Sequence, residues 1–391
     1  MHLAWEHGVK NIWIVNVGDI KPMELPISFW CDYAWNPDRI GPADLQTYTE
    51  QWAAAQLGSE NAREIARILS TYTRYNSIRK PELLDANTFS ISSYNEFRER
   101  VNAWQLLANE AETLAKKIPA EASDAYFQLV LHPVKAMCNL YELYWYTAMN
   151  QLYYRTVRNA RVNEFAQLAR NCFVKDSMIT LAYHQLENGK WNHMMSQTHI
   201  GYTGWQQPPV NRMPALKFLP EDSVKQVDET IITPVYITSI LQIPTGTGRN
   251  LFYQQQQSGV SVEASHFTKA VNSNGISWTV LPDHGRTGSA VTPFPVTAPA
   301  QVPGGSAPQL EYEIYTYSKD SLKLMAYFSP TLNFHGQAEG LQYAVSIDDE
   351  VPQIMSINKE DKNSISGIWN KWVSENIIIK TTRHYIDKPG K

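Results

Sequence analysis

Three things are scarce in this 391-residue chain: cysteine, an excess charge of one sign, and long apolar runs. The three cysteines, Cys31, Cys138 and Cys172, are odd in number and far apart, so they form neither a disulfide framework nor a metal motif. The net charge of -4 shows no excess of basic residues of the kind that binds nucleic acid. No apolar run reaches transmembrane length. The sequence therefore predicts no cofactor, no metal, and neither a nucleic acid nor a membrane as partner.

No signal peptide is recognisable at the start of the sequence. A longer protein could carry one upstream of Met1, so this observation does not fix a compartment. If the full-length protein has such a signal, we expect a periplasmic or extracellular location.

Aromatic residues are abundant, with 12 Trp and 21 Tyr. An aromatic excess is typical of surfaces that stack on sugar rings, and it is equally compatible with ordinary packing. The rest of the composition, 43% hydrophobic and 18% charged, is that of a globular protein. The length predicts two or three domains.

The stretch NIWIVNVGDIKPMELPISFW, residues 11–30, changes character abruptly. Residues 12–15 are apolar and rich in β-branched side chains, which predicts a strand covered on both faces, as in parallel α/β sheets. The carboxyl ends of such strands carry functional groups. Four polar residues follow at once: Asn16, Asp19, Lys21 and Glu24. They either cap the strand end or form a site, and their density favours a site.

One parallel strand cannot cover itself, and only one is predicted before long helices begin. The residues before it, MHLAWEHGVK, have the pattern of a helix end with Gly8 as its stop. We therefore expect an α/β barrel or sheet to lie largely upstream of Met1, with its last strand in this chain.

The remaining chain divides by its periodicity. Long amphipathic stretches, among them 124–159 with a bend at Pro133 and 162–187, predict a helix bundle. From residue 262 onward, short alternating runs such as LEYEIYTYS predict antiparallel strands of a β-sandwich, and the Pro-Gly pair near Lys391 predicts a further returning strand. The predicted domains are the end of a barrel (1–90), a helical bundle (91–204), a connector (205–261) and a β-sandwich (262–391).

Five stretches together resemble the α-glucuronidases of glycoside hydrolase family 115. They occur in the order of the family and cover essentially the whole chain. The stretches are IWIVNVGDIKPMELPISFWCDYAWNP, YTRYNSIRKPELL, GKWNHMMSQTHIGYTGWQQP, HFTKAVNSNGISWTVLPDHGRTGSAVTPFP and AVSIDDEVPQIMSIN. The resemblance implies a multidomain α+β protein, of which this chain holds the end of a (β/α)8 barrel, a helical bundle and a C-terminal antiparallel β-sandwich.

The resemblance also implies an activity. Family 115 enzymes remove D-glucuronic acid or its 4-O-methyl ether from xylan side chains, with glucuronoxylan or its oligosaccharides as substrate. They invert the configuration at the anomeric carbon, so the two catalytic carboxyl groups should lie about 6.5–9.5 Å apart. A homodimer through bundle and sandwich is implied as well. Large aromatics on one predicted helix agree with that, since they spread over several helix faces: Tyr141, Tyr144, Trp145, Tyr153 and Tyr154. Cover of this surface by the barrel of the full protein is the alternative.

Candidate site residues follow the predicted strand. Glu24 is a candidate catalytic carboxylate, although we expect the main acid and base upstream of Met1. Asn16 is a candidate hydrogen-bond donor to the sugar, and a structural amide is the alternative. Lys21 can pair with the uronate carboxylate and Asp19 can orient Lys21 or bind a hydroxyl. A simple loop salt bridge explains both equally well.

Further candidates lie beyond the first loop. Tyr33 and Trp35 can stack on sugar rings or pack the loop. In YNSIRKPEL, Asn76 is the preferred substrate contact, whereas Arg79 either binds substrate or pairs with Glu82.

The segment around His193 and His199 lacks metal-ligand spacing and is interpreted as a hinge that docks the bundle onto its neighbours. A second function from another class remains open: a non-catalytic carbohydrate-binding or assembly module made of bundle and β-sandwich.

Overall fold

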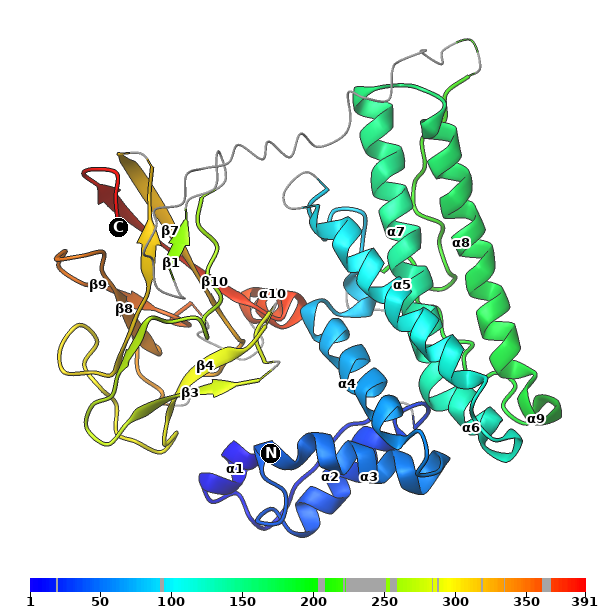
Figure 1. Cartoon of the computed structure of the whole chain (residues 1–391), viewed down its shortest axis with the longest axis horizontal. Helices are drawn as coiled ribbons and strands as arrows, with labels where there is room; N and C mark the ends of the chain where they lie inside the picture. The colour runs from blue at the N-terminus through cyan, green and yellow to red at the C-terminus, as the bar shows by residue number, and fades with distance from the viewer. Residues whose placement is uncertain are drawn as a thin grey trace. The chain divides into compact units, whose positions relative to one another are not determined.

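The computed structural model divides the chain into two compact units (Figure 1). The helical unit comprises Val9–Asn76 and Pro81–Ile237, and the strand unit comprises Met1–Gly8, Ser77–Lys80 and Thr238–Lys391. The boundaries between the four predicted segments remain predictions. The structure describes residues 1–18, 20–91, 95–202, 208–220, 222, 251–253, 259–282, 284–286, 288–317, 319–333, 335–360 and 367–391.

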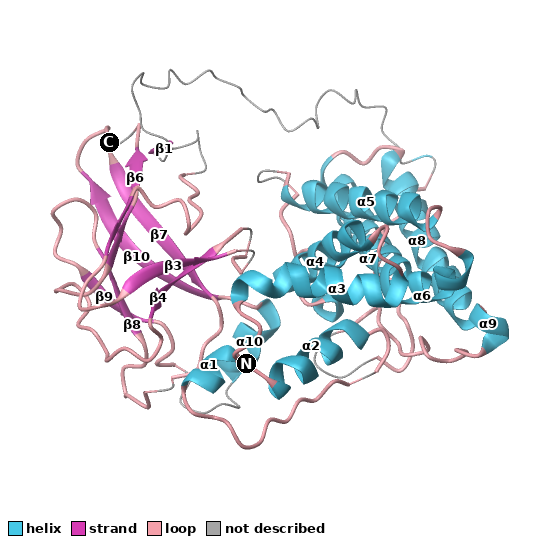
Figure 2. Ribbon diagram, turned by 60° about the horizontal axis from the view of Figure 1, so that its bottom comes forward, coloured by secondary structure: helices cyan, strands magenta, loops and turns pink. Residues whose placement is uncertain are grey.

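Helices make up the regular structure described in the helical unit, as Figure 2 shows in cyan. They are α2 (Glu24–Trp35), η1 (Pro42–Asp44), α3 (Leu45–Leu57), α4 (Ala62–Ile78), η2 (Pro81–Leu83), α5 (Glu96–Ala115), η3 (Ala120–Ala122), α6 (Ser123–Tyr126), the π-helical turn η4 (Phe127–Leu131), α7 (His132–Thr156), α8 (Arg161–His184) and α9 (Leu186–Gly189). The long helices predicted by periodicity are confirmed, and Pro133 lies in the first turn of α7, directly after the π-helical turn.

The core of this unit forms where α7 packs against α5 and α8. The α5 seam is buried at the spacing of one helix face, with Phe97, Val101 and Trp104 at 1% exposure or less. The Trp104 ring contacts Tyr141 of α7, with the two ring centroids 5.4 Å apart. Rings of this size each bury a large apolar area, and an offset or tilted contact is the arrangement they favour.

The aromatic residues that favoured a dimer are covered within one chain. Tyr141, Tyr144 and Tyr153 are buried, and Trp145 and Tyr154 are half-buried. The Arg98 guanidinium lies 4.5 Å from the Trp145 ring centre. These side chains therefore give no support to a homodimer, which remains a prediction.

Part of the predicted connector runs along the helices as an extended strap, residues 211–220. Asn150 of α7 binds both backbone groups of Lys217, accepting from its N–H at 2.8 Å and donating to its carbonyl at 2.8 Å. Asn163 of α8 does the same to Leu219, at 2.9 Å in each direction. The two amides thus supply the hydrogen bonds that a neighbouring strand would give to an extended segment.

The strand unit contains short strands, drawn in magenta in Figure 2. They pair as five two-stranded sheets, β1–β6 in parallel and the other four antiparallel. The strands are β1 (Leu251–Tyr253), β2 (Lys269–Val271), β3 (Ser277–Leu281), β4 (Ala290–Phe294), β5 (Gln309–Glu311), β6 (Glu313–Tyr315), β7 (Asp320–Phe328), β8 (Gln342–Val345), β9 (Gln353–Ser356) and β10 (Ile378–Ile386). Predominantly antiparallel strands are confirmed, whereas their arrangement as a sandwich remains a prediction.

Among the described residues, two further helices belong to the strand unit. α1 (His2–Glu6) agrees with the helix predicted at the start of the chain, and Gly8 follows it with a φ of 83°. α10 (Gly367–Glu375) was not predicted, because it lies within a region of alternating strand patterns.

The prediction of a buried strand at 12–15 is wrong for this structure. Residues 12–17 are not assigned to any strand, and the side chains of Ile12 and Ile14 are 76% and 90% exposed. A strand is held by hydrogen bonds to a neighbouring strand, and no described strand pairs with these residues. The end of a (β/α)8 barrel is therefore not seen among the described residues.

The strap generates a stability prediction. Asn150 is fully buried, so Asn150→Ala leaves the backbone groups of Val162 and Lys217 without partners. We expect the free energy of unfolding to fall by about 2–3 kcal/mol in chemical denaturation. The matched control is Gln151→Ala, which removes one exposed bond of 3.3 Å and should change stability by less than about 0.5 kcal/mol. Equal losses in the two variants would show that the buried amide does not hold the strap.

Candidate functional site

A polar cluster forms around Lys21, on the loop that leads into α2. The Lys21 ammonium lies 2.5 Å from Oε1 of Glu24 and donates to Oε1 of Gln128 at 3.0 Å. The same ammonium is 4.4 Å from the ring centre of Trp191, a distance at which the ring face attracts a cation. We call Lys21, Glu24, Gln128 and Trp191 the Lys21 cluster. It joins the loop before α2 to the turn before α7 and to the segment after α8.

Local structure explains why these side chains meet. Glu24 opens α2, where the helix dipole stabilises a negative charge. Gln128 lies on the π-helical turn η4, and such turns insert an extra residue that redirects side chains, frequently at functional sites. Gln128 is only 5% exposed, so its amide needs a polar partner, and the Lys21 ammonium is one.

Several buried polar atoms at this end of the helices have no hydrogen-bond partner within the described part of the chain. They are Oε2 of Glu24, Nε1 of Trp191, the hydroxyl of Tyr183 and Nδ1 of His132. The Tyr183 and His132 rings contact edge to face, with centroids 4.8 Å apart. A buried polar group without a partner costs about 1–3 kcal/mol, so such a concentration is typical of a site rather than of a stabilising core.

Two histidines near these atoms have opposite electrostatic environments. Burial, aided by the charge of His199, lowers the pKa of His132 to about 4, although Asp176 opposes the effect. Burial acts against protonation of His199 too, but the Asp176 carboxylate 2.9 Å from its Nε2 outweighs it and raises the pKa of His199. One imidazole is thus held neutral and the other favours its charged form.

The structure brings together only part of the predicted site. Lys21 and Glu24 do meet, whereas Asp19 lies outside the described residues. Asn16 is exposed, and its Oδ1 accepts a hydrogen bond from the Gly18 N–H at 3.0 Å, which is a turn-forming contact.

The two predicted stacking residues have different environments. Tyr33 is buried and packs its ring against Trp13 and Phe29, which is the packing alternative. Trp35 is 91% exposed at the end of α2. Of these two residues, only Trp35 therefore has a ring face open to a ligand.

Neither Asn76 nor Arg79 belongs to the Lys21 cluster. Asn76 donates to the Tyr72 carbonyl of its own helix at 3.1 Å, and its buried Oδ1 has no hydrogen-bond partner among the residues that the structure describes. Arg79 lies in the short segment grouped with the strand unit.

Sequence reasoning missed Gln128 and Trp191. Trp191 lies in the motif that was interpreted as a hinge, but no role was predicted for Trp191 itself. Gln128 carried no signal, because only the tertiary contact with Lys21, 107 positions away, makes it part of the cluster.

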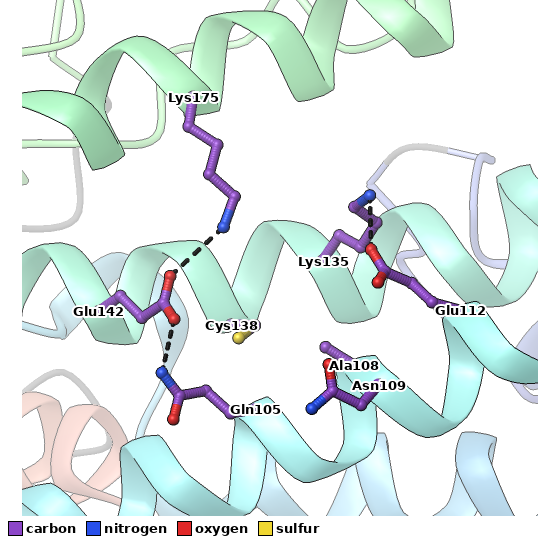
Figure 3. A pocket seen from close by; sticks show the side chains of 8 residues that line it. All are labelled: Gln105, Ala108, Asn109, Glu112, Lys135, Cys138, Glu142 and Lys175. Carbon is purple, nitrogen blue, oxygen red and sulfur yellow. Dashed lines mark hydrogen bonds and ion pairs between the residues drawn. The ribbon is translucent and has the colours of Figure 1, made fainter.

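A separate cavity of about 330 Å³ lies between α5, α7 and α8 (Figure 3). Its charged groups largely satisfy one another: Glu142 binds Gln105 at 2.7 Å and Lys175 at 3.4 Å, and Lys135 binds Glu112 at 2.7 Å. The thiol of Cys138 lines it, and burial raises its pKa to about 12, which makes it a poor nucleophile at neutral pH. These pairs leave the cavity without an obvious binding group.

No set of three His, Cys, Asp or Glu side chains among the described residues is placed to hold a metal ion. In the same residues, no helix has the length and apolarity needed to cross a membrane.

The two histidines generate a pH prediction. With a native pKa near 4, His132 favours the folded state above pH 6.5, and this contribution is lost as the pH falls toward 4, by up to about 3 kcal/mol. We expect His132→Gln to flatten the stability profile in that window, measured by denaturation at a series of pH values.

The contrasting variant is His199→Gln. The raised pKa of His199 stabilises the fold below pH 6.5, and the effect is lost as the pH rises through the native pKa. This substitution should therefore steepen the loss of stability toward acid. Identical profiles for the two variants would contradict the assigned environments.

Comparisons with known proteins match both ends of the chain. The model described as glycosyl hydrolase family 115 matches residues 1–83, and the model of the family 115 C-terminal domain matches residues 252–391. A comparison with curated proteins finds no match. A solved structure described as "a novel family GH115 4-O-Methyl-alpha-glucuronidase, BtGH115A, with specificity for decorated arabinogalactans" is similar, with a TM-score of 0.61 and 21% identity.

That similarity covers 98% of this chain and 44% of the other chain, so it extends over less than half of the solved protein. At this level of identity it shows a shared fold. The two family models together match more than half of the sequence. The chain belongs to glycosyl hydrolase family 115.

Proposed function

We propose that this chain is part of an α-glucuronidase that releases D-glucuronic acid, or its 4-O-methyl ether, from side chains of a polysaccharide such as glucuronoxylan. Family membership supports glycoside hydrolysis, and the similar solved protein is named as a 4-O-methyl-α-glucuronidase. The observation that carries the proposal at the residue level is the Lys21 cluster, which combines a cation, an indole and buried polar atoms that have no hydrogen-bond partner in the described part of the chain.

Lys21 is the proposed contact to the uronate carboxylate. An ammonium has three N–H donors, and those of Lys21 are directed to Glu24 and Gln128 with one remaining. A carboxylate placed there forms a charge-assisted hydrogen bond. Trp191 adds a donor, since its buried N–H has no hydrogen-bond partner within the described chain.

We propose an inverting reaction, in which an acid protonates the leaving oxygen and a base activates water. Glu24 suits a positioning role: its Oε1 is held by Lys21, and its buried Oε2 remains open to accept from a sugar hydroxyl or a water. We place the principal acid and base outside residues 1–391. Assembly as a homodimer remains part of the proposal without support from the aromatic residues of α7.

The alternative is a non-catalytic carbohydrate-binding or assembly module. It is favoured by one observation, namely that the described residues contain helices and small sheets and no barrel. Hydrolysis and binding have to be measured separately to distinguish the two functions.

We expect the purified 391-residue chain to release no glucuronic acid from glucuronoxylan or from a glucuronate-decorated arabinogalactan, because no acid–base pair is assigned within it. Chromatography of the released sugars is the measurement. Turnover by this chain that disappears in Glu24→Gln would contradict the prediction and make Glu24 catalytic. Binding without hydrolysis, even in a protein that combines this chain with a complete barrel, would support the alternative module.

In a family 115 protein that carries this chain together with a complete barrel, Lys21→Met should lower kcat/KM by about 10- to 100-fold, since it removes a charge-assisted hydrogen bond to the substrate. Lys190→Met is the matched control. Its ammonium lies 5.0 Å from the same indole but is 59% exposed and pairs with Glu187. A fall in melting temperature with unchanged kcat/KM would show that Lys21 only forms a structural ion pair.

A further inference from the structure

The longest strand pair of the strand unit presents one face to solvent. β7 and β10 pair antiparallel over nine residues, from Ile378 opposite Phe328 to Ile386 opposite Asp320. Successive side chains of a strand point to opposite faces. One face is inward, with Ile378, Thr382 and His384 buried. The other we call the β7–β10 outer face; its residues are Ser321, Lys323, Met325, Tyr327, Ile379, Thr381, Arg383 and Tyr385.

Two tyrosines mark the two ends of this outer face. Tyr327 is opposite Ile379 and Tyr385 is opposite Ser321, so the tyrosines are six register positions apart, about 20 Å at the rise of a strand. Their side chains are 51% and 52% exposed. An exposed tyrosine offers an apolar ring face with a polar tip, which suits the C–H face and hydroxyls of a sugar. The spacing corresponds to several sugar rings of an extended chain.

Between the tyrosines, two cations face each other. Lys323 and Arg383 are directly opposite in the register, both are exposed, and neither makes an ion pair within the described residues. Like charges directly opposite in a sheet destabilise the pairing. No carboxylate belongs to the eight residues of the outer face. An anion bound between the two side chains would remove this repulsion.

Further cations lie beside the tyrosines. The Arg286 guanidinium is 5.9 Å from the Tyr327 ring centre, and the Lys319 ammonium is 5.6 Å from that of Tyr385. Each aromatic ring of the outer face thus has a positive group next to it, and two more lie between the rings. A neutral glycan needs no such charge, whereas a chain that carries carboxylates does.

We infer that the β7–β10 outer face binds an acidic polysaccharide, with sugar rings stacked on Tyr327 and Tyr385 and uronate carboxylates paired with Lys323 and Arg383. This site lies within the strand unit and is distinct from the Lys21 cluster. It is a binding site only, so it does not depend on the proposed hydrolysis.

A second copy of the chain is a poorer occupant. In a two-fold contact the same patch meets itself, and Lys323 and Arg383 at its centre would then face another pair of cations. The apolar side chains Met325, Tyr327 and Ile379 adjoin at one end of the face, and the two cations separate them from Tyr385 at the other end. Charge complementarity therefore favours a polyanion over self-association.

The test is affinity electrophoresis of the 391-residue chain in gels containing glucuronoxylan, with the carboxyl-reduced polymer as the neutral comparison. We expect retardation by the acidic polymer and much less by the reduced one. The double variant Lys323→Gln/Arg383→Gln should weaken binding at least about tenfold, because two charge-assisted contacts are lost. Added salt should weaken wild-type binding as well.

The matched control is Lys116→Gln/Lys117→Gln, which removes the same charge from exposed positions of the helical unit. Tyr327→Ala and Tyr385→Ala should each reduce binding to both polymers. All four substituted positions of the outer face are exposed, so unchanged melting temperatures are expected and are measured alongside.

Equal retardation of the control and the Lys323/Arg383 variant would overturn the inference, since binding would then follow net charge alone. So would absence of binding in the wild type. A dimer in light scattering that the Lys323/Arg383 variant abolishes would identify a second copy as the occupant instead. Because the test measures binding, its outcome does not depend on whether the protein hydrolyses the polysaccharide.

Discussion

The burial of α7 on nearly every side is the constraint on which the helical unit depends. Five consecutive residues, 137–141, are buried, and at 100° per residue they point in all directions around the helix. A helix that is apolar all round has to be covered all round. α5 and α8 cover two sides, and the strap at 211–220 is held to the end of α7 by Asn150. Directly before α7, Gln128 accepts a hydrogen bond from Lys21 and so links the Lys21 loop to the turn that precedes the helix.

Polar groups inside this packing divide into two kinds. Along the middle of α7 most are satisfied: Thr147 donates to the Leu143 carbonyl at 2.8 Å, and Asn150 binds three backbone groups. Asn139 donates to the Cys172 carbonyl at 2.9 Å, although its Oδ1 has no partner among the described residues. Where the start of α7 meets the end of α8 they are not, since the Nδ1 of His132 and the hydroxyl of Tyr183 have no hydrogen-bond partner among the described residues. Stable interiors pair their polar groups, so groups without partners at this end of the helices lower the stability of the fold. A functional role explains why they are kept there. That contrast supports a site around Lys21 independently of the family match.

Periodicity predicted helices such as α5 well because this helix buries one continuous seam, formed by Phe97, Val101 and Trp104. The strand predicted at 12–15 failed because an apolar run specifies burial but supplies no partner strand. The Lys21–Glu24 contact could be predicted from three-residue spacing, whereas Gln128 and Trp191 come from distant segments and have no local signal. Tyr33 shows the limit of composition: an aromatic residue beside a polar loop is as suited to packing as to sugar binding, and here it packs.

The two proposed sites differ in how their cations are paired. The chain carries a net charge of -4, so at long range it repels an acidic polysaccharide. Screening limits that repulsion to about 8 Å at physiological ionic strength, and within this distance the local cations dominate. The β7–β10 outer face concentrates Lys323 and Arg383 without a carboxylate among its own residues, whereas Lys21 is paired with Glu24. An exposed cation pair without an ion partner among the described residues attracts polyuronates in many positions, whereas a cation held by a carboxylate, an amide and an indole presents its remaining N–H in one direction. The first arrangement therefore suits capture of the polymer, and the second suits selection of a single uronate.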